Sequence, residues 1–406
     1  MALKKWLVIS LVLVMVGCEE FLVSPPEENE ILDGPIEGLT PTQLGIFLAG
    51  DIAFNDDIFS PETGLGPIFV STSCGGCHSG DGKGHPSTIL TRFGRMEGNQ
   101  FDHLLDLGGP QLQNRAIKGY IAEEIPVEAN AVTDLIAPAV TGLGLLASVP
   151  DEAILELVVL QKAEGIVSGE VNYVTPPDFF QPQTWHMPNS QGQYIGRFGK
   201  KSGALDLLHQ TVGAYKQDMG ITTDFDLEDP INYAISNINT DPIVDPEVSA
   251  ATTQNVVFYL QTLKPPLPRN HDDPLIQSGK ELFEDIGCVN CHLSTMETGF
   301  NNIEALSNKV FHPYTDLLLH DMGPQLDDGF VQASELSSEW RTPPLWGLGL
   351  SADSQGGSVH LLHDGRAKSI EEAILLHGGE SESSKESFEQ LDRSEKDIML
   401  DFLKSL

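Results

Sequence analysis

The chain has 406 residues, of which 59 are acidic and 23 basic, so its formal net charge is −36. A field of this sign repels nucleic acid and anionic lipid, and we therefore expect no nucleic-acid partner. The 40% content of hydrophobic residues provides ordinary globular cores. The length suits roughly two or three domains.

The first segment, residues 1–18, is typical of a bacterial lipoprotein signal peptide. Two lysines precede an apolar run that ends at Val16, and Gly17 and Cys18 follow it. A basic start, a short apolar core and a small residue before the cleavage point mark a secretory signal. The run is shorter than the about 20 residues of a membrane span. In the lipoprotein interpretation Cys18 is lipidated; the alternative is a plain signal peptide with an incidental cysteine.

Residues 19–45 are acidic and rich in proline, which predicts a tether between the lipid and the folded body. Glu19, rather than an aspartate, follows the cysteine, and this favours the outer membrane. We expect a location in the cell envelope, as a periplasm-facing or outer-membrane lipoprotein of a Gram-negative-type bacterium. A helix is expected to follow from about Leu44 to Phe54.

Two Cys-x-x-Cys-His motifs organise the rest of the chain. Their cysteines are Cys74, Cys77, Cys288 and Cys291, and their histidines are His78 and His292. This pattern attaches a c-type haem, because both thiols can bond the vinyl groups of one porphyrin while the histidine ligates its iron. We therefore expect two covalently attached c-type haems. Two alternatives stay open: disulfides of a redox enzyme, and zinc bound by four thiolates, which would leave both histidines unexplained.

Several helices are expected between and after these motifs. Pro150 and the two acidic residues that follow it open one helix, and others span Ser202–Asp218 and residues 250–263. A linker, PPLPRNHDDP, occupies residues 265–274. Beyond it, apolar residues at helical spacing lead into the second motif, and residues 394–406 predict a closing helix. This pair resembles the first and last helices of a cytochrome c.

These elements predict a mainly α fold with two cytochrome c-like domains and long loops. We expect the N-terminal haem domain, enlarged by an insertion, to span residues 46–265 and the C-terminal one to span residues 266–406. The two halves also repeat one another in the same order. The paired segments are 137–145 with 342–350, 150–155 with 370–375, and 253–263 with 395–406.

The repeat predicts two unlike haems. His377 follows the AILL segment of the second half, whereas the corresponding residue of the first half is Leu157. A second axial ligand makes an iron six-coordinate and suited to electron transfer, while an open position lets peroxide or oxygen bind. We therefore expect His292 and His377 at the second iron and His78 at the first. The rival sixth ligands are Met322, Met399, His360 and His363, and a surface position is the alternative for His377.

Cleavage of peroxide needs a group that moves a proton between the two oxygens. Glu164 is the first candidate for this catalytic role, because it lies on the same face as Leu157 if that helix continues. His186, in the segment TWHMPN, is the second candidate. Trp346 is a candidate for carrying electrons between the haems. For each of these residues a purely structural role is the alternative.

Together these residues resemble the di-haem oxidoreductase family of peroxidases, also labelled thiol-oxidoreductase-like. This family is related to bacterial di-haem cytochrome c peroxidases and to the methylamine-utilisation di-haem enzyme. The resemblance covers roughly residues 60–406. Its most specific segments are SCGGCH, VTGLGLLASVPDEAIL, GRFGKKSGALDLLHQTVGAYKQDMGIT, GCVNCH, RTPPLWGLGL and HLLHDGRAKSIEEAILLHGGE.

The resemblance also implies a sixth ligand for the second haem. In the peroxidases the segment similar to HDGRAKSIEEAILLH ends in a methionine ligand, and in the methylamine-related enzyme it ends in a tyrosine; the matching residue here is His377. Two histidine ligands stabilise ferric iron and lower its potential, so a high-potential second haem is not implied. The chain also departs from the peroxidases in having no clear WDGRA-type segment after the first motif.

We therefore expect an exported di-haem oxidoreductase that reduces hydrogen peroxide at the N-terminal haem. Electrons would arrive through the C-terminal haem from a small cytochrome or a similar redox partner. Two alternatives belong to other classes. One is a di-haem electron-transfer cytochrome without its own substrate, and the other is a haem oxidase of an organic or protein substrate, as in related rubber oxygenases.

Overall fold

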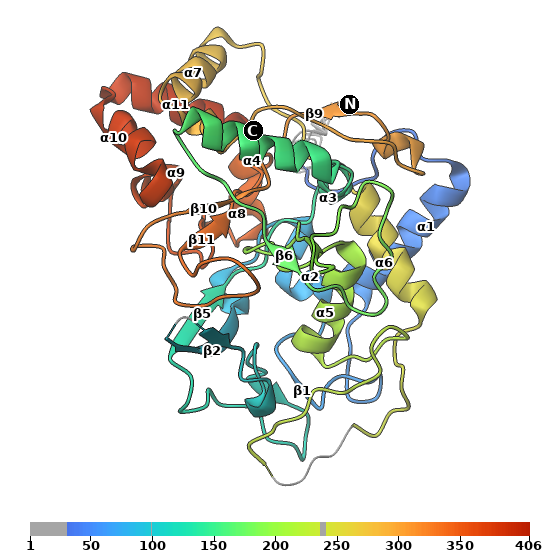
Figure 1. The fold of residues 1–406 in the computed structure, drawn as a ribbon. Coiled ribbons are helices and arrows are strands. Elements are labelled where there is room, and N and C mark those ends of the chain that lie inside the picture. Colours follow the sequence, from blue (N-terminus) through green and yellow to red (C-terminus); the bar gives the residue numbers. More distant parts are fainter. Residues whose placement is uncertain (1–30, 99, 236–240) are drawn as a thin grey trace, which may run out of the picture.

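The computed structural model describes residues 31–98, 100–235 and 241–406. The expected signal peptide, Cys18 and the first part of the tether lie outside these residues. Helices make up 35% and strands 12% of the structure, and the sheets are small. The expectation of a mainly α fold is therefore wrong: the fold mixes helices with short strand pairs (Figure 1). The expected division into two cytochrome c-like domains is not confirmed.

Most of the strands are only two or three residues long, which is why the sequence did not predict them. A run of that length shows no alternation of apolar and polar residues. The longest strand is β2 (Leu90–Glu97), which lies between β3 (Gln100–Asp102) and β5 (Ala131–Leu135) in an antiparallel sheet. The other antiparallel pairs are β1 (Ile68–Phe69) with β4 (Arg115–Ala116), β6 (Tyr173–Val174) with β7 (Tyr194–Ile195), β8 (Met296–Glu297) with β9 (Val310–Phe311), and β10 (Leu319–Asp321) with β11 (Glu339–Arg341).

The expected helices are present, together with several that the sequence did not predict. In the first half they are α1 (Pro41–Asp51), α2 (Cys74–Cys77), α3 (Leu143–Ala147), α4 (Asp151–Glu164), α5 (Leu207–Met219) and α6 (Ala250–Thr262). In the second half they are α7 (Pro274–Asp285), α8 (Ser351–Ser354), α9 (Ile370–Leu375), α10 (Glu382–Gln390) and α11 (Arg393–Ser405). Within the described ranges, no helix is long and apolar enough to span a bilayer.

Side chains at the helix starts explain several of these boundaries. Thr40 accepts a hydrogen bond from the backbone of the first turn of α1, and Asp392 does the same for α11. Asp206 caps α5, which therefore begins at Leu207 rather than at the expected Ser202. Such caps satisfy backbone N–H groups that have no partner inside the helix.

Each half contains one pair of crossed helices, α1 with α6 and α7 with α11 (Figure 1). Gly50 lies where α1 meets α6, and a Cβ atom there would come within 2.0 Å of the Asn255 carbonyl oxygen. Gly279 lies where α7 meets α11, and its Cβ would come within 2.4 Å of the Ile398 carbonyl oxygen. Asn255 and Ile398 occupy matching positions of the sequence repeat, so the two crossings are equivalent.

The turn that follows each haem motif repeats as well. Gly142 and Gly347 have positive φ angles of 69° and 68°, a conformation that favours glycine. The backbone nitrogen of Gly142 donates to the carbonyl oxygen of Leu263, at 3.1 Å, and that of Gly347 to the carbonyl oxygen of Leu406, at 2.7 Å. Both acceptors end the closing helix of their half. These contacts confirm the internal repeat in three dimensions.

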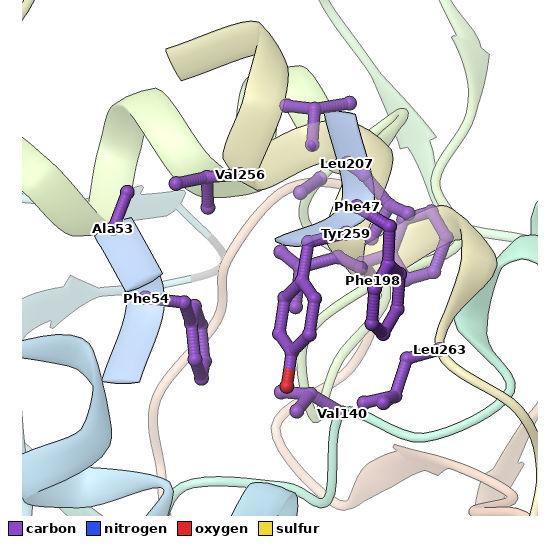
Figure 2. Close-up of a cluster of buried hydrophobic side chains, with 12 residues drawn as sticks. Phe47, Ala53, Phe54, Val140, Phe198, Leu207, Val256, Tyr259 and Leu263 are labelled. Carbon is purple, nitrogen blue, oxygen red and sulfur yellow. The ribbon is translucent and has the colours of Figure 1, made fainter. Parts of the chain in front are cut away.

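Each half has a buried cluster of its own, and a third cluster joins the two halves. The cluster of the first half contains Phe47, Phe54 and Tyr259 and lies between α1, α5 and α6 (Figure 2). The cluster of the second half lies beneath α7 and α11. The third cluster joins Ile154 of α4 to Phe311 and other residues of the second half. Helix α4 therefore belongs to the first half in sequence but packs on the second.

Candidate functional site

The first motif lies on the short helix α2. Ser73 accepts a hydrogen bond from the backbone at its start, and one helical turn then carries both Cys74 and Cys77. The Nδ1 atom of His78 lies 2.8 Å from the carbonyl oxygen of Pro138. Because a carbonyl only accepts, Nδ1 carries the proton and Nε2 keeps a lone pair for a metal. Burial lowers the pKa of His78 to about 4, so the ring stays neutral.

In the second motif the histidine makes the same kind of contact with a backbone carbonyl, but the cysteines lie on and directly after a 3₁₀ turn rather than on an α-helix. Gly287, with a φ of 84°, turns the chain from α7 into a single 3₁₀ turn, Cys288–Asn290. The Nδ1 atom of His292 lies 2.9 Å from the carbonyl oxygen of Tyr314. Burial lowers the pKa of His292 to about 4. Its Nε2 is therefore also available as a ligand atom.

Both motifs line one continuous cavity of about 400 Å³. Its wall combines residues of α5 and α6 with residues of α9 and α11, and residues 340–346 also contribute. The four motif cysteines are free thiols, so they form no disulfide. Within the described residues they also do not gather into one metal-binding group, which leaves the zinc alternative without support.

His377 lines the same cavity and lies near the second motif. Its Nδ1 is 2.7 Å from the carbonyl oxygen of Ala373 in α9, so its Nε2 is free in the same way as that of His292. Its proximity contributes to the lowered pKa of His292, after burial. The structure thus brings together two neutral rings, His292 and His377, on the wall of one cavity, as a six-coordinate iron requires.

The rival sixth ligands differ in their placement. Met322 and Met399 also line the cavity. The His363 ring lines it as well but is stacked on Trp340, with centroids 3.8 Å apart and planes 13° from parallel. His360 is not among the cavity-lining residues, and its Nδ1 faces the Lys368 ammonium at 2.8 Å. His377 lines the cavity and also has its Nδ1 turned to a backbone carbonyl. Neither His360 nor His363 combines these two properties.

A buried ionic network lies beside the second motif. His320 contacts Asp316 at 2.8 Å through Nε2 and Glu380 at 2.9 Å through Nδ1. Burial alone would lower the pKa of His320, but hydrogen bonds to Asp316, Cys291 and Glu380 raise it to about 12. Gln161 of α4 donates to Asp316 at 2.8 Å. A protonated imidazole, held by two carboxylates, therefore lies on the cavity wall beside the second motif.

The wall near the first motif is supplied by α5. Its cavity-lining residues are Leu207, Gln210, Thr211, Ala214, Asp218 and Met219. Asp218 is the only carboxylate of this part of the described wall, and Gln111 donates to it at 2.7 Å. Burial raises the pKa of Asp218 to about 6, although Gln111 and Arg92 act in the opposite direction. His363 also approaches this part of the wall, because its carbonyl oxygen accepts from the Ile136 nitrogen at 2.9 Å, but its ring is stacked on Trp340. Among the described histidines of the wall, those with Nδ1 turned to a backbone carbonyl are His78 at the first motif and His292 and His377 at the second.

The structure does not bring the two expected catalytic residues to the cavity. Glu164 is exposed at the end of α4, and Leu157 packs in the third cluster against the second half. His186 stacks on Phe180, 5.4 Å between centroids, away from the cavity wall. The reason is the course of α4, which crosses to the second half; Gln161 shows this by donating to the Asn290 carbonyl of the second motif at 3.0 Å.

Trp346 lies where the two halves meet. Its side chain lines the cavity, and its ring faces Phe311 at 6.2 Å. It also touches the repeated turn of the first half, since a Cβ on Gly142 would come within 2.5 Å of the indole. The structure therefore shows a packing role for Trp346, and a role in electron transfer stays a prediction.

Cationic side chains that sequence reasoning missed show how the cavity suits a haem. Lys83, Lys200 and Arg341 line it. Within the described residues, neither the Lys83 nor the Lys200 ammonium is in an ion pair. By contrast Lys201, next to Lys200 in the sequence, pairs with Asp328 at 3.3 Å. Burial lowers the pKa of Lys83 to about 8 and, with repulsion from Lys83 and Arg341, that of Lys200 to about 7.

A haem carries two propionates, which are the anions that such uncompensated cations accommodate. The thiol pairs, the free Nε2 atoms and these cations therefore fit the group. No local pattern of the sequence marks these cations, because Lys83, Lys200 and Arg341 reach one cavity wall only through tertiary folding.

The comparisons with known proteins agree with the cofactor assignment. Residues 130–406 match the family described as "Di-haem oxidoreductase, putative peroxidase". Among solved structures, the chain is similar to hydrazine synthase of Kuenenia stuttgartiensis pressurised with xenon, with 13% identity, a TM-score of 0.37, and coverage of 99% of this chain and 100% of that one. That likeness is too weak to carry an argument. No curated protein matches the chain. On the extent of the family match, the chain belongs to the di-haem oxidoreductase family.

Proposed function

We propose that this di-haem oxidoreductase reduces hydrogen peroxide at a haem attached to Cys74–His78. Electrons would reach it through a second haem attached to Cys288–His292. One observation carries the proposal: three described histidines of the cavity wall have Nδ1 held by a backbone carbonyl, and two of them, His292 and His377, belong to the second site whereas one, His78, belongs to the first. An iron with two protein ligands exchanges electrons, whereas one with a single ligand also binds a substrate.

Covalent attachment is part of the proposal. It is supported by two free thiols on one turn next to a histidine with a free Nε2 in both motifs. Each thiol would add across one vinyl group of its porphyrin. When bound, an open haem iron supplies the position at which peroxide binds and is reduced. The balance is one peroxide, two electrons and two protons giving two waters, with the electrons coming from an external redox donor.

The chain's own contribution to that reaction is proton transfer. We assign this role to Asp218, which replaces Glu164 because it lines the cavity by the first motif. Its raised pKa, about 6, lies close to neutral pH, where a carboxyl group both accepts and returns a proton effectively. Its carboxylate would take a proton from one oxygen of peroxide and deliver it to the other. Gln111, at 2.7 Å, holds that carboxylate in place.

Electron delivery between the sites is supported by the shared cavity. Residues 340–346 line it together with both motifs, and Trp346 lies between the halves. Groups of both halves therefore face the same cavity. The proposal is that electrons cross along this segment, with Trp346 as the aromatic side chain best placed to assist.

Electron paramagnetic resonance of the oxidised protein tests the asymmetry. We expect one high-spin ferric signal from the first haem and one low-spin signal from the second. Stopped-flow mixing with peroxide should then change only the high-spin signal within the first turnover. Two low-spin signals in both the oxidised and half-reduced forms would contradict the peroxidase and favour an electron-transfer cytochrome.

We also propose that the protein acts in the cell envelope, anchored through lipidated Cys18, and receives electrons from a small redox protein. The support is the signal-like segment 1–18 and the acidic tether after it. A net charge of −36 favours a donor with a basic surface. Fractionation of producing cells after inhibition of lipoprotein signal peptidase should leave an unprocessed precursor; unchanged processing would contradict the anchor.

A further inference from the structure

Three carboxylates converge in the segment that joins α5 to α6. Asp229, Asp241 and Glu247 each place a ligand-type oxygen within 4.8 Å of the others. They lie outside the cavity and share no residue with its wall. The segment runs from the end of α5 at Met219 to the start of α6 at Ala250.

Each of these carboxylates uses one oxygen to hold the backbone. An oxygen of Asp229 accepts from the Asp241 nitrogen at 3.3 Å, and one of Asp241 accepts from the Ile243 nitrogen at 2.7 Å. An oxygen of Glu247 accepts from the Thr222 nitrogen at 2.8 Å. These bonds fix the orientation of the three groups, as the ligands of a preformed site require.

The other oxygen of each carboxylate is buried and has no hydrogen-bond partner among the described residues. Asp241 as a whole is only 6% exposed. Buried polar atoms without a partner are rare in native proteins and point to an ion or water that satisfies them. Three such oxygens from three neighbouring carboxylates are therefore the mark of a missing positive charge.

The surrounding side chains do not supply that charge. Lys216 of α5 contacts Asp226 at 2.9 Å and Glu228 at 3.9 Å rather than these three carboxylates. Asp245 adds a further carboxylate, which binds the Thr222 hydroxyl at 3.0 Å. Burial, followed by repulsion from Asp245, Asp241 and Glu247, raises the pKa of Asp229 to about 7.

We propose that Asp229, Asp241 and Glu247 bind a calcium ion. The donor set is made only of oxygens, which selects a hard cation over zinc, copper or iron. Calcium accepts irregular sets of carboxylate and backbone oxygens with several waters, whereas magnesium demands a compact octahedron. The second cluster of potential ligands, Cys291 with Asp316 and His320, is different, because the His320 protons already satisfy both carboxylates beside it.

The ion would close the segment between α5 and α6. Glu247 ties to Thr222, three residues after α5 ends, and the Val248 nitrogen donates to the Thr222 carbonyl at 3.2 Å. The same α5 carries Asp218 and Met219 on the cavity wall. Calcium would thus stabilise the wall of the first site without touching it.

Isothermal titration of the chelator-treated, haem-loaded chain with calcium chloride at pH 8 tests the site. We expect one ion per chain with a dissociation constant between about 1 μM and 1 mM. Asp229→Asn and Asp241→Asn should each weaken binding by at least about tenfold. Glu228→Gln is the matched control, because that adjacent carboxylate is exposed and outside the cluster; its calcium affinity should equal that of the wild type.

Thermal unfolding separates a lost site from a damaged fold. Calcium should raise the midpoint of the wild type and of Glu228→Gln, and leave Asp241→Asn unchanged. In chelator, Asp241→Asn should unfold at or above the wild-type temperature, because one of the repelling charges is gone. The proposal is overturned if the wild type binds no calcium, if both Asn variants bind as tightly as the wild type, or if magnesium binds equally well.

Discussion

Each half of the molecule places a phenylalanine between its motif histidine and an aromatic ring of its closing helix. Phe54 lies 5.7 Å from His78 and 5.5 Å from a ring on α6. Phe283 lies 6.3 Å from His292 and 5.6 Å from a ring on α11. With the glycine crossings and the repeated turns, this arrangement shows that one scaffold was used twice.

The two halves differ at the position of the repeat that holds His377 in the second half and Leu157 in the first. The second half ends its short helix α9 so that His377 reaches the cavity, while the first half extends the matching helix, α4, across to its partner. The position of Leu157 is thereby removed from the cavity, and α5 takes over the wall. The repeated scaffold therefore presents the two motif histidines in the same way, and the packing of one helix removes from the first site the residue that matches His377.

The strongest test of the comparison removes one attachment site at a time. Cys74→Ser with Cys77→Ser should leave the low-spin signal and abolish the high-spin one, and Cys288→Ser with Cys291→Ser should do the reverse. Each double variant should retain about half of the covalent haem, because one porphyrin loses both thioether bonds. Pyridine haemochrome content and haem-stained denaturing gels measure it; full haem in either variant would contradict covalent attachment there.

A second test makes the two haems alike. His377→Ala should turn the second haem high-spin, because its iron loses the sixth ligand, and added imidazole should restore the low-spin spectrum. His363→Ala is the control for the rival ring on the cavity wall and should leave the second haem low-spin. A high-spin change in that variant instead would transfer the assignment from His377 to His363.

A third test concerns the pH dependence of the first site. Burial raises the pKa of Asp218 to about 6, and the carboxylate form accepts the proton. The rate with peroxide should therefore rise as the pH increases through about 6 and level off above it. Asp218→Asn should lower the rate by about 10²–10⁴-fold and remove this limb while haem content is unchanged. Exposed Asp106→Asn should keep the wild-type profile; an unaltered profile for Asp218→Asn would exclude the role.

These expectations also show what the sequence could predict. The helices around residues 41–51, 151–164 and 250–262 were predicted because caps and apolar spacing are local signals. Short sequence patterns also singled out the motif histidines and His377, which the structure brings to one cavity wall; their role as iron ligands stays a prediction. The fold class was predicted wrongly because strands of two or three residues leave no periodic trace.

The rest of the site depends on contacts between distant segments. Asp218, Lys83 and Lys200 meet only when three separate stretches fold around one cavity, so no local pattern marks them. Glu164 was chosen by extending the repeat along a helix. That step failed because α4 follows its own packing, fixed at its start by a buried ion pair between Asp151 and Arg197.

A fourth test compares the two helix crossings. Gly50→Ala and Gly279→Ala should each lower the free energy of unfolding by about 1–3 kcal/mol, because the new methyl group meets a backbone carbonyl. Gly45→Ala on the same helix α1 meets no described atom within 4 Å and should raise stability by about 0.5–1 kcal/mol. Guanidinium unfolding of the haem-loaded chain measures all three; equal results for Gly45 and Gly50 would contradict the close approach.

The smallest expected effect comes from a hydroxyl group that the first core has and the second core lacks at a matching position. Tyr259, whose hydroxyl is visible in Figure 2, donates to the buried Asp81 at 2.6 Å. The matching residue of the second half is Phe402. Tyr259→Phe should cost about 1–2 kcal/mol, because Asp81 loses a donor that it cannot replace with water. Phe402→Tyr should also destabilise, since its hydroxyl would enter an apolar cluster without a partner.

Tyr215→Phe is the control for removing a phenol hydroxyl, because no hydrogen bond from Tyr215 to a described residue is lost. Its unfolding midpoint should stay close to that of the wild type. If Tyr259→Phe were equally neutral, the hydrogen bond to Asp81 would contribute nothing, and the first core would be held by the same apolar contacts as the second. A loss confined to Tyr259→Phe would instead show that the two copies of the scaffold have diverged in stability as well as in the ligands they present.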